Sequence, residues 1–357
     1  MASKRCVITA VVLGALVLYV LFWPVSIRPG FWVPQEIPAL KGNYKPNTAL
    51  EDVNYITVTD GTGPEDVIFD AEGHMYAGLE DGRIVRYSLD GEQVGFFADT
   101  GGRPLGMEFD AQGNLIVADA YEGLLSVTPD GEVSVLTNQV DGEAIAFAEG
   151  VAIAADGMIY FTEASHVFTY DKHDLEELEH QPNGRLLAYD PDTDITHVMV
   201  AELYYPSGVV VSPDQTFLLV VESGNYSVRR IGLSGAHRGL NEVFIDNLPG
   251  IPHGITTNGE DTFWLTLVEG PETRQFLDQM SSEPYAREIL ARLPKFLRPS
   301  HINGGYVYGL DMEGNVVCSL QDPSGVAYAE ITAAVEHDGM LYLGSQTEES
   351  IAYLAVP

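Results

Sequence analysis

The chain has 357 residues, of which 45% are apolar and 36 are glycine, and its 18 basic residues against 52 acidic ones give a formal net charge of −34. This charge repels nucleic acids and anionic lipid headgroups, so we expect no nucleic-acid binding. The apolar and glycine content argues against a disordered chain and is typical of a β-rich globular protein.

The N-terminal segment differs in composition from the rest of the chain. Lys4 and Arg5 are followed by residues 6–27, which carry no charge and are mostly apolar. A stretch of this length can span a bilayer as a helix, whereas a cleaved signal peptide would show a shorter apolar core and a small-residue cleavage site. The stretch instead ends in the bulky sequence FWPVSIRPGFW. We therefore interpret residues 1–28 as a transmembrane signal anchor.

This anchor predicts a single-pass membrane protein. The positive-inside rule places the N-terminus in the cytoplasm, so the rest of the chain would lie in a periplasm, a lumen or the extracellular space. Residues 29–50 are rich in proline and have no clear period, which is typical of a linker. The two cysteines are Cys6, in the anchor, and Cys318, so no disulfide is expected within the globular part.

From residue 51 onward the sequence repeats one pattern. GPEDVIFDAEGHMYAGLEDGRIVRYSLDGE and RPLGMEFDAQGNLIVADAYEGLLSVTPDGE both alternate short apolar strands with D-x-x-G and D-G turns, and about six such copies follow one another. Short strands at this spacing are typical of propeller blades. We therefore predict an all-β fold, a six-bladed β-propeller over residues 51–357. Two separate β-sandwiches are the alternative, which the periodic turns fit less well.

Two segments interrupt the repeat. Residues 166–183 enlarge the third copy and residues 271–303 the fifth. In the second segment apolar residues recur at roughly helical spacing, which predicts a helical insert in the fifth blade. We interpret it as a cap on one face of the propeller, with a lid over the central site or a basic patch facing a membrane or partner as alternatives. Its basic residues are Arg274, Arg287, Arg292, Lys295 and Arg298.

Equivalent positions of the repeats converge on the propeller axis, because the first strand of each blade lines the centre. In the first, second, third and sixth copies the axial position lies eight residues before the turn glycine, and aligning SPDQ and TNGE on the same turn gives it in the fourth and fifth. It is polar in four copies, and in the second and sixth it is Leu105 and Ile331. Two carboxylates, a hydroxyl and an imidazole could hold one divalent cation there. A wet channel mouth lined by polar side chains without a metal is the alternative. The four polar positions are Glu65, Glu149, Ser207 and His253.

The motifs GPEDVIFD, GMEFDAQGNLIVADAYEGLLSV, GMIYFTEAS, GRLLAYDP, YYPSGVVVSPD, EVFIDNLPGIPHGI and AAVEHDGMLYLGS resemble the strictosidine-synthase-like branch of the SMP-30/gluconolactonase/paraoxonase superfamily. Within it, the chain is most similar to the membrane-anchored adipocyte plasma membrane-associated proteins. The resemblance covers about residues 50–357. It implies a six-bladed propeller and, in hydrolytic members, an axial calcium ion and lactonase, arylesterase or phosphotriesterase activity.

The resemblance also implies which residues would be ligands. Glu65 matches the family's first-blade Glu, but the Asn, Asn and Asp ligands expected in the third to fifth blades are replaced by Glu149, Ser207 and His253. The catalytic Glu that strictosidine synthase has in its last blade corresponds to Thr332, so strictosidine synthase activity is not expected. Glu330 lies two residues from that position.

Two functions follow as hypotheses. In the first, the protein is a metal-dependent hydrolase of lactones or esters, in which a divalent metal polarises the carbonyl. Glu65, Glu149 and Ser207 would be ligands, His253 a ligand or a general base, and Asp119 of the VADAY motif a second catalytic residue.

In the second hypothesis the propeller is a non-catalytic binding module, an accessory subunit of a membrane complex that handles lipids. It would have a degenerate metal site and an integral membrane protein as its partner. The replaced ligands favour this alternative, because Ser and His suit calcium less well than carboxylate and carbonyl oxygens. Metal analysis together with a panel of esters and lactones separates the two.

Overall fold

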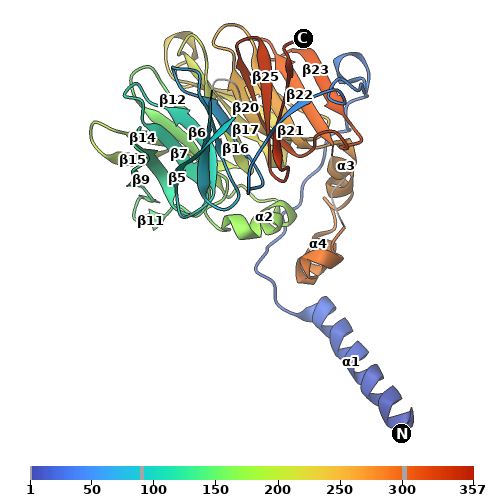
Figure 1. The fold of residues 1–357 in the computed structure, drawn as a ribbon. Coiled ribbons are helices and arrows are strands. Elements are labelled where there is room, and N and C mark those ends of the chain that lie inside the picture. The colour runs from blue at the N-terminus through green and yellow to red at the C-terminus, as the bar shows by residue number, and fades with distance from the viewer. Residues whose placement is uncertain (1, 89–91, 300–303) are drawn as a thin grey trace.

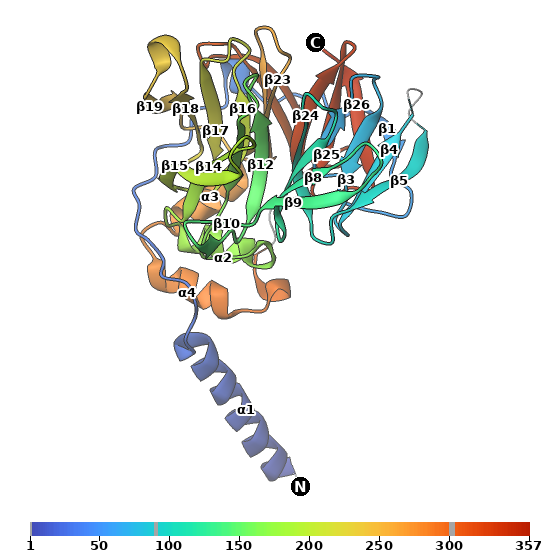
Figure 2. The ribbon, with the colours of Figure 1, turned by 90° about the vertical axis from the view of Figure 1, so that its left-hand side faces the viewer.

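Six four-stranded antiparallel sheets form the computed structural model, which describes residues 2–88, 92–299 and 304–357 (Figures 1 and 2). Blade 1 consists of β2 (Val67–Phe69), β3 (Met75–Gly78), β4 (Arg83–Tyr87) and β5 (Gln93–Asp99). Blade 2 consists of β6 (Pro104–Phe109), β7 (Leu115–Asp119), β8 (Gly123–Val127) and β9 (Val133–Thr137). Blade 3 consists of β12 (Ala148–Ile153), β13 (Ile159–Glu163), β14 (Gly184–Asp190) and β15 (Ile195–Leu203).

The second half of the ring repeats the arrangement. Blade 4 consists of β16 (Pro206–Val211), β17 (Phe217–Glu222), β18 (Ser227–Gly232) and β19 (Asn241–Ile245). Blade 5 consists of β20 (Ile251–Thr257), β21 (Phe263–Glu269), β22 (Gly305–Leu310) and β23 (Val316–Asp322). Blade 6 consists of β24 (Ile331–His337), β25 (Met340–Ser345), β26 (Ser350–Ala355) and β1 (Asn54–Thr57), and a small hairpin of β10 (Gln139–Val140) and β11 (Glu143–Ala144) precedes blade 3. The predicted all-β, six-bladed propeller is confirmed.

The ring is closed by strands from both ends of the chain. β1 pairs with β26, with Asn54 opposite Tyr353 and Thr57 opposite Ser350, so the last blade contains the first strand of the domain. At the axis, the Thr332 hydroxyl of blade 6 donates a hydrogen bond of 2.6 Å to the Glu65 carbonyl of blade 1. The two ends of the domain therefore share one sheet, which closes the ring.

The D-x-x-G turns that repeat in the sequence connect the two innermost strands of blades. In blade 1, one Asp70 carboxylate oxygen accepts the backbone N–H groups of Glu72 and His74, and Gly73 has φ +87°. Asp110 makes the same contacts between the two inner strands of blade 2, and Asp311 makes them between the outer strands β22 and β23 of blade 5. An Asp side chain that satisfies two turn amides, followed by a glycine at positive φ, explains why this motif recurs with the blades.

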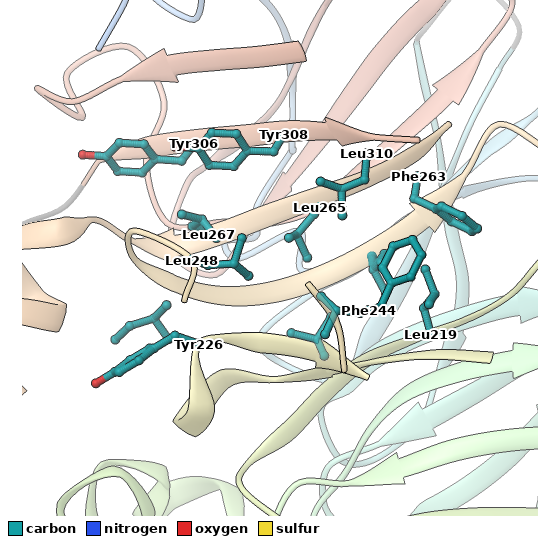
Figure 3. Close-up of a cluster of buried hydrophobic side chains, with 14 of the residues drawn as sticks. Leu219, Tyr226, Phe244, Leu248, Phe263, Leu265, Leu267, Tyr306, Tyr308 and Leu310 are labelled. Carbon is teal, nitrogen blue, oxygen red and sulfur yellow. The ribbon is translucent and has the colours of Figure 1, made fainter. Parts of the chain in front are cut away.

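Apolar side chains fill the spaces between neighbouring blades. Figure 3 shows the cluster between blades 4 and 5, in which Leu219 and Phe244 face Phe263 and Leu265. All four are less than one-tenth exposed. Comparable clusters lie between the other blades, so packing between blades as well as strand pairing stabilises the ring.

The helices gather at one end of the propeller. α2 (His173–Glu179) lies between β13 and β14, and α3 (Pro271–Gln279) and α4 (Pro284–Arg292) lie between β21 and β22. α1 (Ala2–Phe22) stands away from the ring at this same end (Figures 1 and 2). Of the predicted insert 271–303, residues 300–303 lie outside the described part of the chain. Across the described residues, no helix combines the length and apolar character needed to cross a membrane, so the predicted transmembrane span is not confirmed.

Buried arginines of the insert hold the linker between α1 and the ring. Arg287 is 1% exposed, bonds the carbonyl oxygens of Gly30 and Leu178, and lies over the ring of Trp32 at 4.7 Å. Arg292 Nε donates a 2.5 Å bond to the carbonyl oxygen of Trp23. These arginines therefore fasten the linker and do not form an exposed basic patch.

Replacing Arg287 with methionine should release this linker. The change leaves backbone carbonyl groups without their buried donor, and we expect the free energy of unfolding to fall by about 2 kcal/mol. Limited proteolysis should then cut faster near Gly30, and urea unfolding should report the loss. Arg238→Met, at an exposed position, is the matched control. Equal cleavage rates in the two variants would contradict the clamp.

Candidate axial site

A bulge at the start of the inner strands of blades 3, 4 and 5 turns the axial residue toward the centre. The strand register shifts between Ala148 and Val151 in β12, between Pro206 and Val209 in β16, and between Pro252 and Ile255 in β20. The extra residues of these bulges include Glu149, Ser207 and His253. Bulges commonly re-aim side chains in this way.

The bulges also identify the sixth axial position. In β24 the register shifts between Ile331 and Ala333, so the bulged residue is Thr332. Counting back from the turn glycine assigned the axial position to Ile331. In the structure, Ile331 is fully buried and packs in a hydrophobic cluster. A bulge changes the number of residues between the turn and the axial position, so the counted position and the observed one differ by one residue.

A glycine follows several axial residues because the inner strands approach closely. A Cβ atom on Gly254 would lie 1.9 Å from the carbonyl oxygen of Thr332, and one on Gly150 would lie 2.5 Å from that of Ser207. Neither distance is sterically tolerable. The Gly after His253 and after Glu149 is thus required by blade packing.

The axial side chains form a chain of ion pairs. His253 Nε2 lies 3.1 Å from Glu149 Oε1 and 3.9 Å from Glu65 Oε1. Glu65 Oε2 in turn accepts a 2.5 Å bond from Arg103 Nη2. Glu65 and Glu149 are each 4% exposed and Arg103 is 1% exposed. Charges removed from water to this extent need partners, and these residues supply them to one another.

Burial and charge shift the protonation of this group in a coupled way. Burial raises the pKa of Glu149 above its ordinary value, as does the charge of Glu65, although the bond to His253 opposes the rise. Burial alone would lower the pKa of His253, but the two carboxylates raise it above its ordinary value. The imidazole also bonds the backbone of Thr332, which favours its charged form.

The backbone of Ser207 lies at the axial position, but its hydroxyl group is hydrogen-bonded to neighbouring residues. It is fully buried and bonds the carbonyl oxygen of His253 at 2.8 Å and the hydroxyl of Ser223 at 2.9 Å. Ser223 Oγ donates a 2.7 Å bond to the carbonyl oxygen of Pro252. The two serines therefore join blades 4 and 5.

The predicted metal ligands Glu65, Glu149, Ser207 and His253 do not fit a calcium ion as they are placed. Arg103 occupies one oxygen of Glu65, and the Ser207 hydroxyl faces the backbone. Calcium takes six to eight oxygen ligands. In the described part of the chain, no cluster of three or more His, Cys, Asp or Glu side chains is arranged to hold a metal ion.

Asp119 lies apart from this group. It is fully buried at the end of β7, where Oδ1 accepts the N–H groups of Tyr121 and Glu122 at 2.9 and 3.0 Å. Its neighbour Tyr121, and not Asp119, lines the cavity above the axial residues. These contacts give Asp119 a role in shaping the turn, and its predicted catalytic role stays a prediction.

The axial residues separate two cavities. One, of about 620 Å³, opens toward the helices and is called here the mouth cavity. The other, of about 210 Å³, follows the inner strands and is called the channel. Both cavities are lined by Glu65, Leu105, Glu149 and His253. A molecule in the mouth cavity would therefore rest directly on the His253–Glu149 pair.

The wall of the mouth cavity combines aromatic and acidic side chains. Tyr170 makes edge contacts with Tyr121 at 5.9 Å and with Phe147 at 5.5 Å between ring centroids, and Tyr205 adjoins Phe147. This wall was not predicted, because Tyr170 belongs to the insert 166–183 and has no equivalent in the repeat. The acidic lining residues beyond the axial pair are Glu80, Asp171, Glu177, Glu269 and Glu330.

The channel holds two further carboxyl groups that the sequence analysis missed. Asp66 accepts the N–H of Met107 at 2.8 Å, and Glu108 accepts that of Ile153 at 3.0 Å, so each joins its blade to the next. Burial raises the pKa of Asp66 to about 7 and that of Glu108 to about 8. Asp66 directly follows the axial Glu65, and Glu108 lies three residues after the axial Leu105. Both are on the face of the inner strand that the alternation of side chains turns toward the channel.

Glu108 should make stability depend on pH. Its folded-state pKa of about 8 lies above that of the unfolded chain, so its stabilising protonation is complete at low pH and is lost as pH rises toward 8. The Glu108→Gln substitution removes this ionisable group, so the variant should gain stability relative to the parent protein as pH rises from about 5 to about 8. Urea unfolding across this range measures it, with the exposed Glu313→Gln as control. Parallel curves for parent and E108Q would show that Glu108 ionises normally.

A six-bladed propeller with a polar group at the axis defines a broad structural class, and comparisons narrow it. The model of the family "Strictosidine synthase" matches residues 144–235, and that of "Strictosidine synthase-like, N-terminal" matches residues 42–87. Protein strictosidine synthase-like 6 of Arabidopsis thaliana is 34% identical over 83% of this chain and 80% of its own length. The adipocyte plasma membrane-associated protein of Bos taurus is 32% identical over 95% of this chain and 86% of its own. The chain belongs to the strictosidine-synthase-like family.

Solved structures extend the likeness of fold. A gluconolactonase from Xanthomonas campestris superimposes with a TM-score of 0.62 at 16% identity, over 93% of this chain and 99% of its own. Regucalcin from Agrobacterium tumefaciens, a calcium-binding protein, gives 0.58 at 13% identity, over 83% and 93%. These likenesses show that the chain shares the propeller fold of these structures.

Proposed function

We propose that this protein hydrolyses lactones or esters in the mouth cavity, with Glu149 as the general base. The observation that carries the proposal is the state of the Glu149 carboxylate. Oε1 is held by His253 at 3.1 Å, whereas the buried Oε2 has no hydrogen-bond partner among the described residues. A buried carboxylate oxygen without a donor is costly, and a water or substrate proton would satisfy it.

The chemistry follows from that arrangement. A water molecule at Glu149 Oε2 would give up a proton to the carboxylate as its oxygen attacks the carbonyl carbon of an ester or lactone. Glu149 would then return that proton to the leaving alcohol oxygen as the acyl–oxygen bond breaks. His253 would hold the carboxylate in place and, when protonated, favour the negative charge that develops on the carbonyl oxygen. A carboxyl group whose pKa is raised above its ordinary value is a stronger base in this transfer than an ordinary one. No step is assigned to a metal, because the axial donors do not fit one.

Several observations support a hydrolase over a passive module. The mouth cavity of about 620 Å³ is in the size range of small-molecule sites and ends on the charged pair. Its aromatic wall of Phe147, Tyr170 and Tyr205 suits an apolar acyl or alcohol group. The gluconolactonase of Xanthomonas campestris shares the fold. The alternative, an accessory binding module with an integral membrane partner, would use the same cavity without turnover.

The proposal predicts the behaviour of an isosteric variant. Glu149→Gln keeps the shape of the side chain but removes the base, so kcat/KM for the best substrate of an ester and lactone panel should fall by about 100-fold or more. The control is His197→Asn, at an exposed position on β15, which should keep full activity. Unchanged turnover by E149Q would remove Glu149 from the mechanism. Absence of turnover by the parent protein on the whole panel would favour the binding module.

We also propose that α1 holds the protein at a membrane. Its apolar side chains are exposed on all sides, with Val7, Ile8, Val11 and Leu18 each 60–65% exposed. A helix that is apolar all round is typical of a lipid environment. The relative from Bos taurus is named as plasma membrane-associated, which agrees with this proposal.

Fractionation of cells tests this association. The full chain should sediment with membranes and need detergent for release, because burial of the exposed α1 side chains in lipid is favourable. The double substitution V11D/L18D should move the protein to the soluble fraction. V317D, on the outer strand β23 where the side chain is 57% exposed, should not. Membrane recovery of V11D/L18D equal to that of V317D would contradict an anchor in α1.

A further inference from the structure

A buried arginine lies behind the axial site, at the start of the second repeat. Arg103 precedes β6 in the sequence GGRP and is 1% exposed. Its Nη2 contacts Glu65 Oε2 at 2.5 Å and its Nη1 donates a 2.9 Å bond to the carbonyl oxygen of Gly63. A guanidinium buried to this degree is stable only with a matched anion, and Glu65 is that anion.

Glu65 is fixed from three sides. Its backbone N–H bonds the carbonyl oxygen of Gly78 at 3.1 Å, and its carbonyl oxygen accepts the Thr332 hydroxyl at 2.6 Å. The side chain is held by Arg103 at one oxygen, and the other oxygen lies 3.9 Å from His253. The carboxylate therefore has one orientation, set by a permanent cation from the neighbouring blade.

The group already contains a permanent positive charge without an added ion. Glu65 and Glu149 contribute two negative charges, Arg103 contributes a permanent positive charge, and the His253 imidazole adjoins both carboxylates. A divalent cation between the two glutamates would meet the guanidinium at short range and be repelled by it. It would also have to replace Arg103 at Glu65 Oε2.

We propose that Arg103 is a built-in cation that takes the place of a calcium ion at Glu65, so that the axial site is assembled without a divalent metal. Arg103 is thus a positioning residue: it orients Glu65 and leaves Glu149 and His253 to face the mouth cavity. The inference concerns the same site as the proposed hydrolase. It is tested by metal binding and holds or fails whether or not an ester is turned over.

The test compares calcium binding by the full-length protein and its variants. Equilibrium dialysis against radioactive calcium and thermal unfolding in calcium or EDTA should show no bound ion and no shift in Tm for the parent protein. Arg103→Gln releases the Glu65 carboxylate from its cation. The variant should bind calcium and unfold at a higher temperature in calcium than in EDTA, and the double variant R103Q/E65Q should lose both effects.

Arg185→Gln is the matched control. Arg185 forms a comparable ion pair in blade 3 with Glu163, which is fully buried, at 2.6 Å. Its removal should lower stability without creating a response to calcium. If R103Q binds no calcium, or if R185Q gains the same response, the proposal is overturned.

Calcium binding by the parent protein also tests the proposal without the R103Q variant. If R103Q does not fold, the parent and Glu65→Gln are compared. The proposal predicts no bound calcium in either. One calcium ion per parent chain that is lost in E65Q would overturn it.

Discussion

The close approach of the inner strands at the propeller axis is the constraint on which the rest of the site depends. Gly150 and Gly254 have no room for a Cβ atom, because the backbone of the next blade lies against them. The bulged strands β12, β16 and β20 therefore each present one side chain to the axis and a glycine to the neighbouring blade. Side chains placed in so small a space must be complementary in charge, since few water molecules can separate them. The chain of contacts from Arg103 through Glu65 and His253 to Glu149 satisfies that requirement.

The inner strands and the inserts together connect the axial site to the rest of the propeller. Hydrogen bonds between inner strands, such as those from Thr332 to Glu65 and from the N–H of Met107 to Asp66, hold neighbouring blades in register around the axis. The inserts then shape what lies above it. Tyr170 comes from the segment before α2 and completes the aromatic wall. The insert of blade 5 contributes the arginines that fasten the linker to the same end of the molecule, near the end of α1 (Figure 2).

Much of this arrangement was predictable from the repeat. Counting from the D-x-x-G turns places Glu65, Glu149, Ser207 and His253 at the axis, because turn and axial position have a fixed separation in a regular blade. The rest needed coordinates for physical reasons. A bulge moves the sixth position from Ile331 to Thr332, and the rotamer of Ser207, which the sequence does not encode, turns its hydroxyl to the backbone.

Arg103 shows most clearly where sequence reasoning ends. It lies two residues before the axial Leu105, and only the packing of blade 2 against blade 1 brings its guanidinium to Glu65. The insert arginines likewise form a basic cluster in the sequence but point inward, because the linker carbonyl groups need donors. Contacts between elements distant in sequence decided both cases.

The central claim is that the axial group is balanced by its own charges, with Arg103 at Glu65. A high-resolution crystal structure of the purified protein grown in millimolar calcium tests this most directly, with anomalous scattering to identify any ion. The account predicts that Arg103 remains in contact with Glu65 and that no ion lies between Glu65 and Glu149. An anomalous peak coordinated by both glutamates, with the guanidinium displaced, would contradict it.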